Sequence, residues 1–91
     1  MALQLFTTTA FERDLRRVRR QGRDLDKLGP IVDLLQQEQP LPERCRVHPL
    51  RGPWSGCWDC HVEPDWLLIY RVSAGRLTLI RTGSHSELFR R

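Results

Sequence analysis

The spacing of the apolar residues changes near Arg44, and this change limits the folds that the chain can adopt. Before it, Phe11, Leu15 and Val18 recur at positions i, i+4 and i+7, which places them on one face of a helix. After it, apolar residues alternate with polar ones, or β-branched and aromatic residues cluster, as in strands. A chain of 91 residues can bury one modest core. We therefore expect one domain over residues 1–91, an α+β fold with two N-terminal helices packed on one face of a small, mostly antiparallel sheet.

The first residues predict a strand and then a capped helix. Residues 2–7 alternate in character as a short strand does. Thr9 and Glu12 have the spacing of a capping box, in which each side chain bonds a backbone N–H near the helix start. Gly22 is suited to the end of this helix, because glycine readily adopts the left-handed conformation found there.

A second helical pattern runs over residues 25–35 and is interrupted by a Gly-Pro pair. Proline inside a helix removes a donor and clashes with the preceding turn, whereas it is tolerated in the first turn. Gly29 and Pro30 therefore predict either a kink or a new helix start. Pro40 and Pro42 are expected to end the helical region.

The C-terminal half predicts three or more strands. A short strand is expected around Val47, followed by a loop from His48 to Pro53. Ala74 and Gly75 suit a tight hairpin turn between the last two strands. The element order becomes β-α-α-β-β-β, with strand candidates over residues 57–63, 65–73 and 76–82 and a final helical turn or tail over 84–89.

Composition indicates which class of partner the protein binds and in which cellular compartment we expect it. The formal charge is +4, and Lys27 is the only lysine, so the positive charge is almost wholly arginine. Arginine presents a planar fork that matches phosphate oxygens, so we expect a nucleic-acid or acidic protein partner. The longest apolar run is too short to span a bilayer, and the N-terminus lacks the pattern of a signal peptide. These features predict a cytoplasmic protein, with no membrane partner and with reduced cysteines.

The stretch Cys57-Trp-Asp-Cys60-His61 permits three interpretations. It matches the C-x-x-C-H pattern of haem attachment, but the only methionine available as a second axial ligand is Met1. With Cys45 and His48 it also gives four zinc ligands at plausible spacing. The surrounding alternation instead predicts a strand with its cysteines on opposite faces and Cys60 toward the core. We expect no metal and no cofactor.

Acid–base chemistry is the third interpretation of this region. All three histidines lie in the C-terminal half, together with several carboxylates and Arg81. Histidine donates and accepts protons near neutral pH, and a guanidinium can neutralise charge that builds on phosphorus. Those groups meet the needs of metal-independent RNA cleavage, in which the 2′-hydroxyl attacks the neighbouring phosphate. The candidate residues are His48, His61, His85, Asp59, Glu63, Asp65 and Arg81.

The spaced motifs of this half resemble the YafQ branch of the RelE/ParE toxin superfamily. They are His48-Pro-Leu-x-Gly, Trp-x-Gly, Asp59-x-His61-Val-Glu-Pro-Asp65-Trp66 and Arg81-Thr-Gly-x-His85-x-x-Leu-Phe89. The resemblance implies a RelE-like fold with the active site in a concave, basic groove. By position it implies that His48, His61, Asp65 and His85 are catalytic and that Arg81 holds the phosphate. It also implies that Trp66 and Phe89 support the site or contact RNA and that Asp59 is a further site residue. We add Arg51 as an RNA-binding candidate.

The same resemblance implies a function and partners. It implies a ribosome-dependent endoribonuclease, the toxin of a type II toxin–antitoxin pair, that cuts mRNA in the ribosomal A site and leaves a 2′,3′-cyclic phosphate. It also implies inhibition by a cognate DNA-binding antitoxin, of ribbon-helix-helix type. The three cysteines are unexpected for the family but replace no motif residue. A non-enzymatic protein-binding module, such as a ParE-like or decayed toxin, is the alternative.

Overall fold

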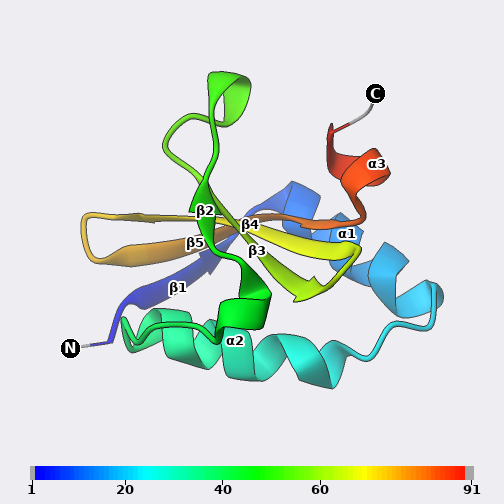
Figure 1. Cartoon of the computed structure of the whole chain (residues 1–91), viewed down its shortest axis with the longest axis horizontal. Coiled ribbons are helices and arrows are strands. Elements are labelled where there is room, and N and C mark those ends of the chain that lie inside the picture. The colour runs from blue at the N-terminus through cyan, green and yellow to red at the C-terminus, as the bar shows by residue number, and fades with distance from the viewer. Residues whose placement is uncertain (1, 90–91) are drawn as a thin grey trace.

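The computed structural model describes residues 2–89 and forms one five-stranded sheet with helices on both faces (Figure 1). The strand order is β1-β5-β4-β3-β2. Strands β5, β4, β3 and β2 are joined antiparallel, and β1 pairs with β5 in parallel. The mixed, mostly antiparallel α+β fold that the sequence predicts is confirmed. The strands are β1 Gln4–Thr7, β2 His48–Pro49, β3 Trp58–Glu63, β4 Trp66–Ser73 and β5 Arg76–Gly83, and the α-helices are α1 Thr9–Arg20, α2 Leu28–Gln36 and α3 His85–Phe89.

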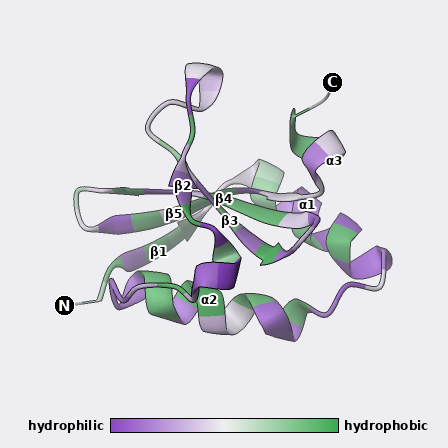
Figure 2. Cartoon of the chain, viewed as in Figure 1, coloured by the Kyte–Doolittle hydropathy of each residue, from purple (hydrophilic) through white to green (hydrophobic). Residues whose placement is uncertain are grey.

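Helices α1 and α2 cover one face of the sheet and enclose the main core. Phe11 and Val18 of α1 are buried there, as the helical spacing predicts. Figure 2 shows hydrophobic and hydrophilic bands alternating along both helices, as expected for helices with one buried face. The sheet contributes Cys60, Trp66, Leu68, Tyr70, Leu77 and Leu79.

The opposite face of the sheet has a smaller apolar cluster. Leu67 and Ile69 of β4 are fully buried against Leu88 of α3. The loop between β2 and β3 contributes Trp54, which meets Phe89 edge to face at a ring-centroid distance of 6.1 Å. This cluster packs α3 against the sheet. The candidate site lies beside the cluster on the same face.

The predicted helix boundaries need two corrections. The cap of α1 is Thr8, one residue before the predicted Thr9, and its Oγ1 accepts from the backbone N–H of Phe11 at 2.9 Å. Thr8 is preferred because its hydroxyl also donates to the Ile80 carbonyl at 2.7 Å, a contact from a distant strand. The second helix ends at Gln36, before the proline that was expected to end it.

The Gly-Pro pair is resolved in favour of a new helix start. A short 3₁₀ turn over Leu25–Lys27 precedes α2, which places Pro30 in the first turn of the helix. Gly22, with φ of +83°, follows the end of α1 as predicted. In the hairpin turn, Ala74 and Gly75 both have positive φ, 53° and 75°, as a two-residue hairpin loop requires.

The predicted strand around Val47 is displaced by one residue. Strand β2 consists of His48 and Pro49, so His48 lies on a sheet edge and not in a loop. Its partner across the ladder is Asp59. This pairing matters for the site, because it brings the two side chains to the same face of the sheet.

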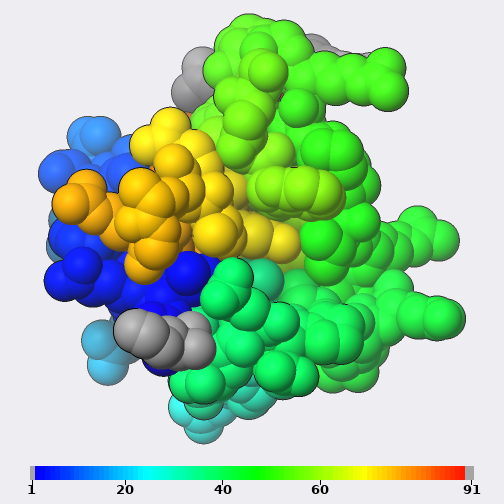
Figure 3. All heavy atoms as spheres, turned by 90° about the vertical axis from the view of Figure 1, so that its left-hand side faces the viewer, coloured from blue at the N-terminus to red at the C-terminus, as the bar shows by residue number. Residues whose placement is uncertain are grey.

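One end of the sheet leaves large apolar side chains exposed. Figure 3 shows β1, the β4–β5 hairpin end and the segment after α2 side by side on this face. Leu5 and Val72 flank buried Leu77 in a row across β1, β5 and β4, and each is about two-fifths exposed. Among the residues 2–89, no helix is long and apolar enough to cross a membrane.

Candidate active site

Three histidines gather on the face of the sheet opposite α1 and α2. His61 lies between the other two: its ring centroid is 6.5 Å from that of His48 and 5.6 Å from that of His85. His61 pairs with Leu67 across the β3–β4 ladder, and the bulge between His61 and Glu63 bends β3 there. These residues come from β2, β3 and the start of α3, so the sheet brings together groups that are far apart in the sequence.

His85 is held by the turn between β3 and β4. Its Nδ1 lies 2.8 Å from Asp65 Oδ1, and its backbone N–H donates to the same oxygen at 3.1 Å. The hydrogen bond from the His85 side chain lowers the pKa of Asp65 below its ordinary value, so the carboxylate is ionised at neutral pH. An ionised carboxylate can only accept, so Nδ1 carries the proton and Nε2 is left for proton transfer.

His48 is held on the other side of His61. Its Nδ1 lies 2.9 Å from the Arg46 carbonyl oxygen, which can only accept, so Nδ1 is the protonated nitrogen. Its Nε2 faces Asp59 Oδ2 at 3.4 Å. Burial raises the pKa of Asp59, while the charges of the three histidines lower it to a smaller extent. The contact places an imidazole nitrogen beside a carboxyl group, an arrangement suited to a proton-transfer group.

Two buried polar atoms in this cluster have no hydrogen-bond partner among the described residues. They are Asp59 Oδ1 and His61 Nδ1. An unpaired buried polar atom is destabilising, and such atoms are found where a site awaits a ligand or a proton. One belongs to the partner of His48 and the other to the ring between His48 and His85, which fits a site organised for function.

Two of the expected RNA-binding residues, Asp59 and Trp66, are buried. Asp59 is 2% exposed, and its carboxylate faces His48. Trp66 is fully buried in the helix-covered core, where its Nε1 donates to Thr82 Oγ1 at 2.8 Å. This position fits the supporting role among the two that the resemblance implies. Phe89 is half-buried against Trp54, and Arg51 is exposed in the neighbouring loop.

Arg81 lies on the same face but not beside the histidines. The row His48, Asp59, Ile69 and Arg81 runs across β2, β3, β4 and β5. With strands about 4.8 Å apart, Arg81 is roughly 10 Å from Asp59 at the Cα atoms. Its guanidinium is paired with Asp14 of α1, which raises the pKa of Arg81 further. The sequence motifs pointed to Arg81 but not to its partner.

The expected basic groove is only partly present. A cavity of about 310 Å³ beside His61 is lined by Arg44 and Arg46, which the motifs did not single out. A cavity of about 580 Å³ on the other side of the Asp65 turn is lined mainly by polar and acidic groups: Gln21, Gly22, Arg23, Asp24, Glu63, Asp65, Ser84 and Glu87. The surroundings of the site are therefore basic beside Arg44 and Arg46 and mainly acidic beside Asp24, Glu63 and Glu87.

The cysteine stretch has the arrangement of an ordinary strand. Cys60 is fully buried in the main core, and burial strongly raises the pKa of its thiol. Cys57 packs half-buried against the smaller cluster on the opposite side. Among residues 2–89, no three His, Cys, Asp or Glu side chains are placed to hold one metal ion.

Comparison with known proteins identifies relatives along the whole chain. The profile of a family described as "Bacterial toxin of type II toxin-antitoxin system, YafQ" matches residues 3–90. The mRNA interferase toxin YafQ of Escherichia coli K12 is 40% identical over 80 residues, 87% of each chain. The toxin in the crystal structure of the E. coli DinJ-YafQ complex superposes with a TM-score of 0.90 at 36% identity, covering 98% and 99% of the two chains. A metal-bound toxin from Helicobacter pylori superposes with a TM-score of 0.90 at 40% identity, covering 96% and 99%.

Proposed function

The chain belongs to the YafQ family of type II toxin–antitoxin toxins, and from this premise we propose that it is a ribosome-dependent endoribonuclease that cleaves translated mRNA. The observation that carries the proposal is the pair of histidine–carboxyl contacts on either side of His61. His48 faces Asp59 and His85 is bonded to Asp65, so two separate proton-transfer groups share one face of the sheet. A phosphodiester cleavage needs one group to remove a proton and another to supply one.

The proposed reaction forms one bond and breaks another. The 2′-oxygen attacks the adjacent phosphorus while the bond to the 5′-oxygen breaks, which leaves a 2′,3′-cyclic phosphate and a 5′-hydroxyl. His48 or His61 accepts the proton of the 2′-hydroxyl, and protonated His85 gives a proton to the leaving 5′-oxygen. The carboxylate of Asp65 orients His85 and stabilises its charged form.

Arg81 supplies charge stabilisation in this proposal. The phosphate gains negative charge in the transition state. A guanidinium that is held in place therefore stabilises the transition state more than it stabilises the ground state. Arg44 and Arg46, beside His61, are suited to bind the flanking phosphates of the message. The scheme uses side chains of this chain alone and assigns no step to a metal.

An antitoxin is the second proposed partner, by analogy with the DinJ protein of the related E. coli complex. The exposed row of Leu5 and Val72 beside buried Leu77 supports a protein contact at that end of the sheet. The surplus positive charge would speed association with an acidic segment and make it sensitive to salt. An association rate equal at low and high salt would count against this steering.

The decisive experiment is single-turnover cleavage of mRNA on programmed ribosomes. We expect the wild-type protein to cut the message in the A site and leave cyclic phosphate ends. His85→Ala should slow cleavage by about 10²–10⁴-fold, the usual contribution of a proton-transfer group. Products with 3′-hydroxyl ends would exclude the proposed chemistry, and no cleavage by the wild-type protein would favour the non-enzymatic alternative.

A further inference from the structure

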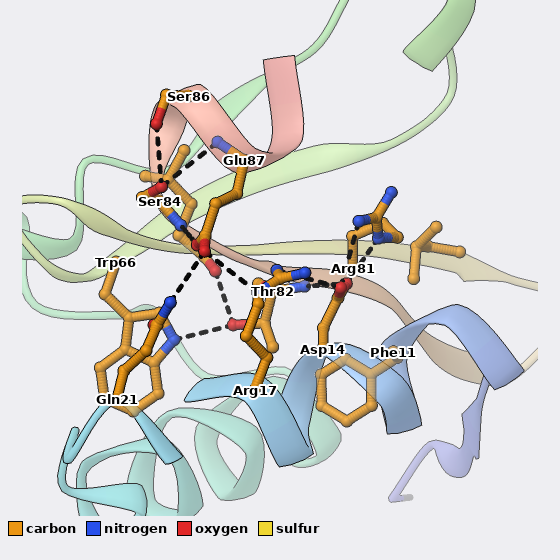
Figure 4. A network of polar contacts seen from close by, with 12 residues as sticks. Phe11, Asp14, Arg17, Gln21, Trp66, Arg81, Thr82, Ser84, Ser86 and Glu87 are labelled. Atoms are coloured by element: carbon orange, nitrogen blue, oxygen red, sulfur yellow. Dashed lines mark hydrogen bonds and ion pairs between the residues drawn. The ribbon is translucent and has the colours of Figure 1, made fainter. Parts of the chain in front are cut away.

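Asp14 is a buried carboxylate on α1 that directly contacts the arginine of the candidate site. It is 3% exposed, although α1 is otherwise rich in exposed arginine. Its two oxygens accept from Arg81 Nε, from Arg81 Nη2 at 3.1 Å and from the backbone N–H of Thr82 at 3.1 Å. Arg17 Nη2 also lies 3.1 Å from it. Figure 4 shows these contacts converging on Asp14 from β5 and α1.

The contacts occur along the part of β5 that no longer has β1 beside it. Strand β1 pairs with β5 only as far as Leu79, which leaves the last residues of β5 without a neighbouring strand on that side. Side chains of α1 bond these backbone groups instead: Asp14 accepts from the Thr82 N–H, and Arg17 donates to the Thr82 carbonyl at 3.3 Å. Backbone groups must find partners when buried, which explains a polar stripe on a helix that faces the sheet.

The same stripe continues to the segment that carries His85. Arg17 pairs with Glu87 at 3.1 Å, and Gln21 donates to Glu87 at 2.8 Å. Gly83 lies against this pair with φ of +155°, and a Cβ there would be 2.8 Å from Arg17 Nη2. A larger residue would be strained by this backbone angle and would have to displace the end of the Arg17 side chain.

The pairing fixes the guanidinium of Arg81 while leaving part of it available. Asp14 occupies Nε and Nη2, so the Nη1 edge is the one that remains for a ligand. The Arg81 side chain is 27% exposed. A guanidinium that is already held in place loses little conformational entropy when it meets a phosphate, and it need not reorganise as charge develops.

We propose that Asp14 is a positioning residue for Arg81, acting on the chemical step through the guanidinium that it holds. The inference rests on the proposed ribonuclease function and deepens it by adding a residue of α1, 67 positions from Arg81 in the sequence, to the site. Removing the carboxylate leaves Arg81 free to adopt several rotamers. The rate of cleavage then falls, while binding to the ribosome is retained, because a mobile arginine still attracts phosphate.

The test is a double-mutant cycle measured by single-turnover cleavage on programmed ribosomes. We expect Asp14→Asn to lower the rate at saturating ribosome by about 10–10²-fold, below the 10²–10³-fold expected for loss of the donor in Arg81→Gln. The half-saturating ribosome concentration should stay unchanged. Added to Arg81→Gln, Asp14→Asn should have no further effect, because residues that act through one another are non-additive. Glu12→Gln, an exposed carboxylate change on the same helix, is the matched control.

Three outcomes would overturn the proposal. These are a wild-type rate in Asp14→Asn, an equal further fall in the Arg81→Gln background, and a loss confined to ribosome binding. Failure of the wild-type protein to cleave would instead overturn the proposed function, so the two failures are distinguishable.

A spectroscopic measurement keeps the proposal testable without activity. The ¹H–¹⁵N signal of Arg81 Nε, assigned by its loss in Arg81→Gln, should be protected from exchange in the wild type and lose that protection in Asp14→Asn. If Asp14→Asn does not fold, Asp14→Glu keeps the charge but lengthens the side chain. Asp14→Glu should shift the Nε signal and lower the cleavage rate. If the rate fell while the Nε signal stayed identical to that of the wild type, the proposal would be overturned.

Discussion

The backbone N–H and the imidazole Nδ1 of His85 both lie within hydrogen-bond distance of one oxygen of Asp65, at 3.1 and 2.8 Å. The first residue of α3 is thus bonded twice to the β3–β4 turn, 20 positions earlier in the chain. The turn is itself held by the segment between α1 and α2, since Arg23 donates to the Asp65 carbonyl at 3.2 Å and pairs with Glu63, which also pairs with Lys27. The orientation of the proposed general acid therefore depends on several elements.

Asp65→Asn should slow cleavage by about 10²-fold, at the low end for a proton-transfer group, while the protein remains folded. The amide can still accept one hydrogen bond, but it lacks the charge that stabilises protonated His85. Single-turnover cleavage measures the rate, and circular dichroism measures the fold. Asp26→Asn, an exposed carboxylate change in the 3₁₀ turn before α2, should retain the wild-type rate. Equal rates in both variants would show that Asp65 does not orient the acid.

Asp59→Asn should stabilise the protein at neutral pH and slow cleavage. Burial raises the folded-state pKa of Asp59, so the unfolded chain ionises first, near the ordinary value of 3.8. The wild type therefore loses stability as the pH rises from 3.8 through the folded-state value, and the amide variant does not. Each kcal/mol gained corresponds to about 4–8 °C in Tm. Thermal unfolding from pH 3 to 8 should show the Tm of the variant rising relative to that of the wild type as the pH rises. A difference in Tm that stays constant with pH would contradict the raised folded-state pKa of Asp59.

Trp66→Phe should cost stability and not catalytic rate. The substitution removes the hydrogen bond from Nε1 to Thr82 and leaves a small void in the main core. We expect the free energy of unfolding to fall by about 1–3 kcal/mol, measured by urea denaturation. Cleavage by the folded variant should match the wild type under the same conditions. A large loss of ribosome-bound activity at unchanged stability would instead support direct contact between Trp66 and RNA.

The cysteine stretch should bind neither haem nor zinc. Cys60 is sealed in the main core and Cys57 packs in the cluster on the other face. Elemental analysis after a chelator wash should therefore find no stoichiometric iron or zinc. Replacing Cys57 by Ser and Cys60 by Ala should leave growth arrest intact, at a stability cost of about 1–2 kcal/mol from lost packing. Metal retained by the wild type and lost in this double variant would reverse the conclusion.

Local physics in the sequence was sufficient for several features of this protein. The stripe of Phe11, Leu15 and Val18 predicted the buried face of α1, because helical periodicity is a property of neighbouring residues. Ala74 and Gly75 predicted the hairpin turn, since few residues accept positive φ at successive positions. The three histidines were proposed together from their side-chain chemistry and from the family motifs, and the fold places their rings near one another.

Only the tertiary structure decided which groups meet. Thr8 and not Thr9 caps α1 because a carbonyl of β5 lies beside it, a contact 72 residues away in sequence. Asp14 contacts Arg81 because the pairing of β1 with β5 stops at Leu79, so α1 packs against the unpaired end of β5. Local sequence determines how a segment turns and which face is apolar. Strand register and the ends of strands are instead set by long-range packing, and they determine the partner of each charged side chain.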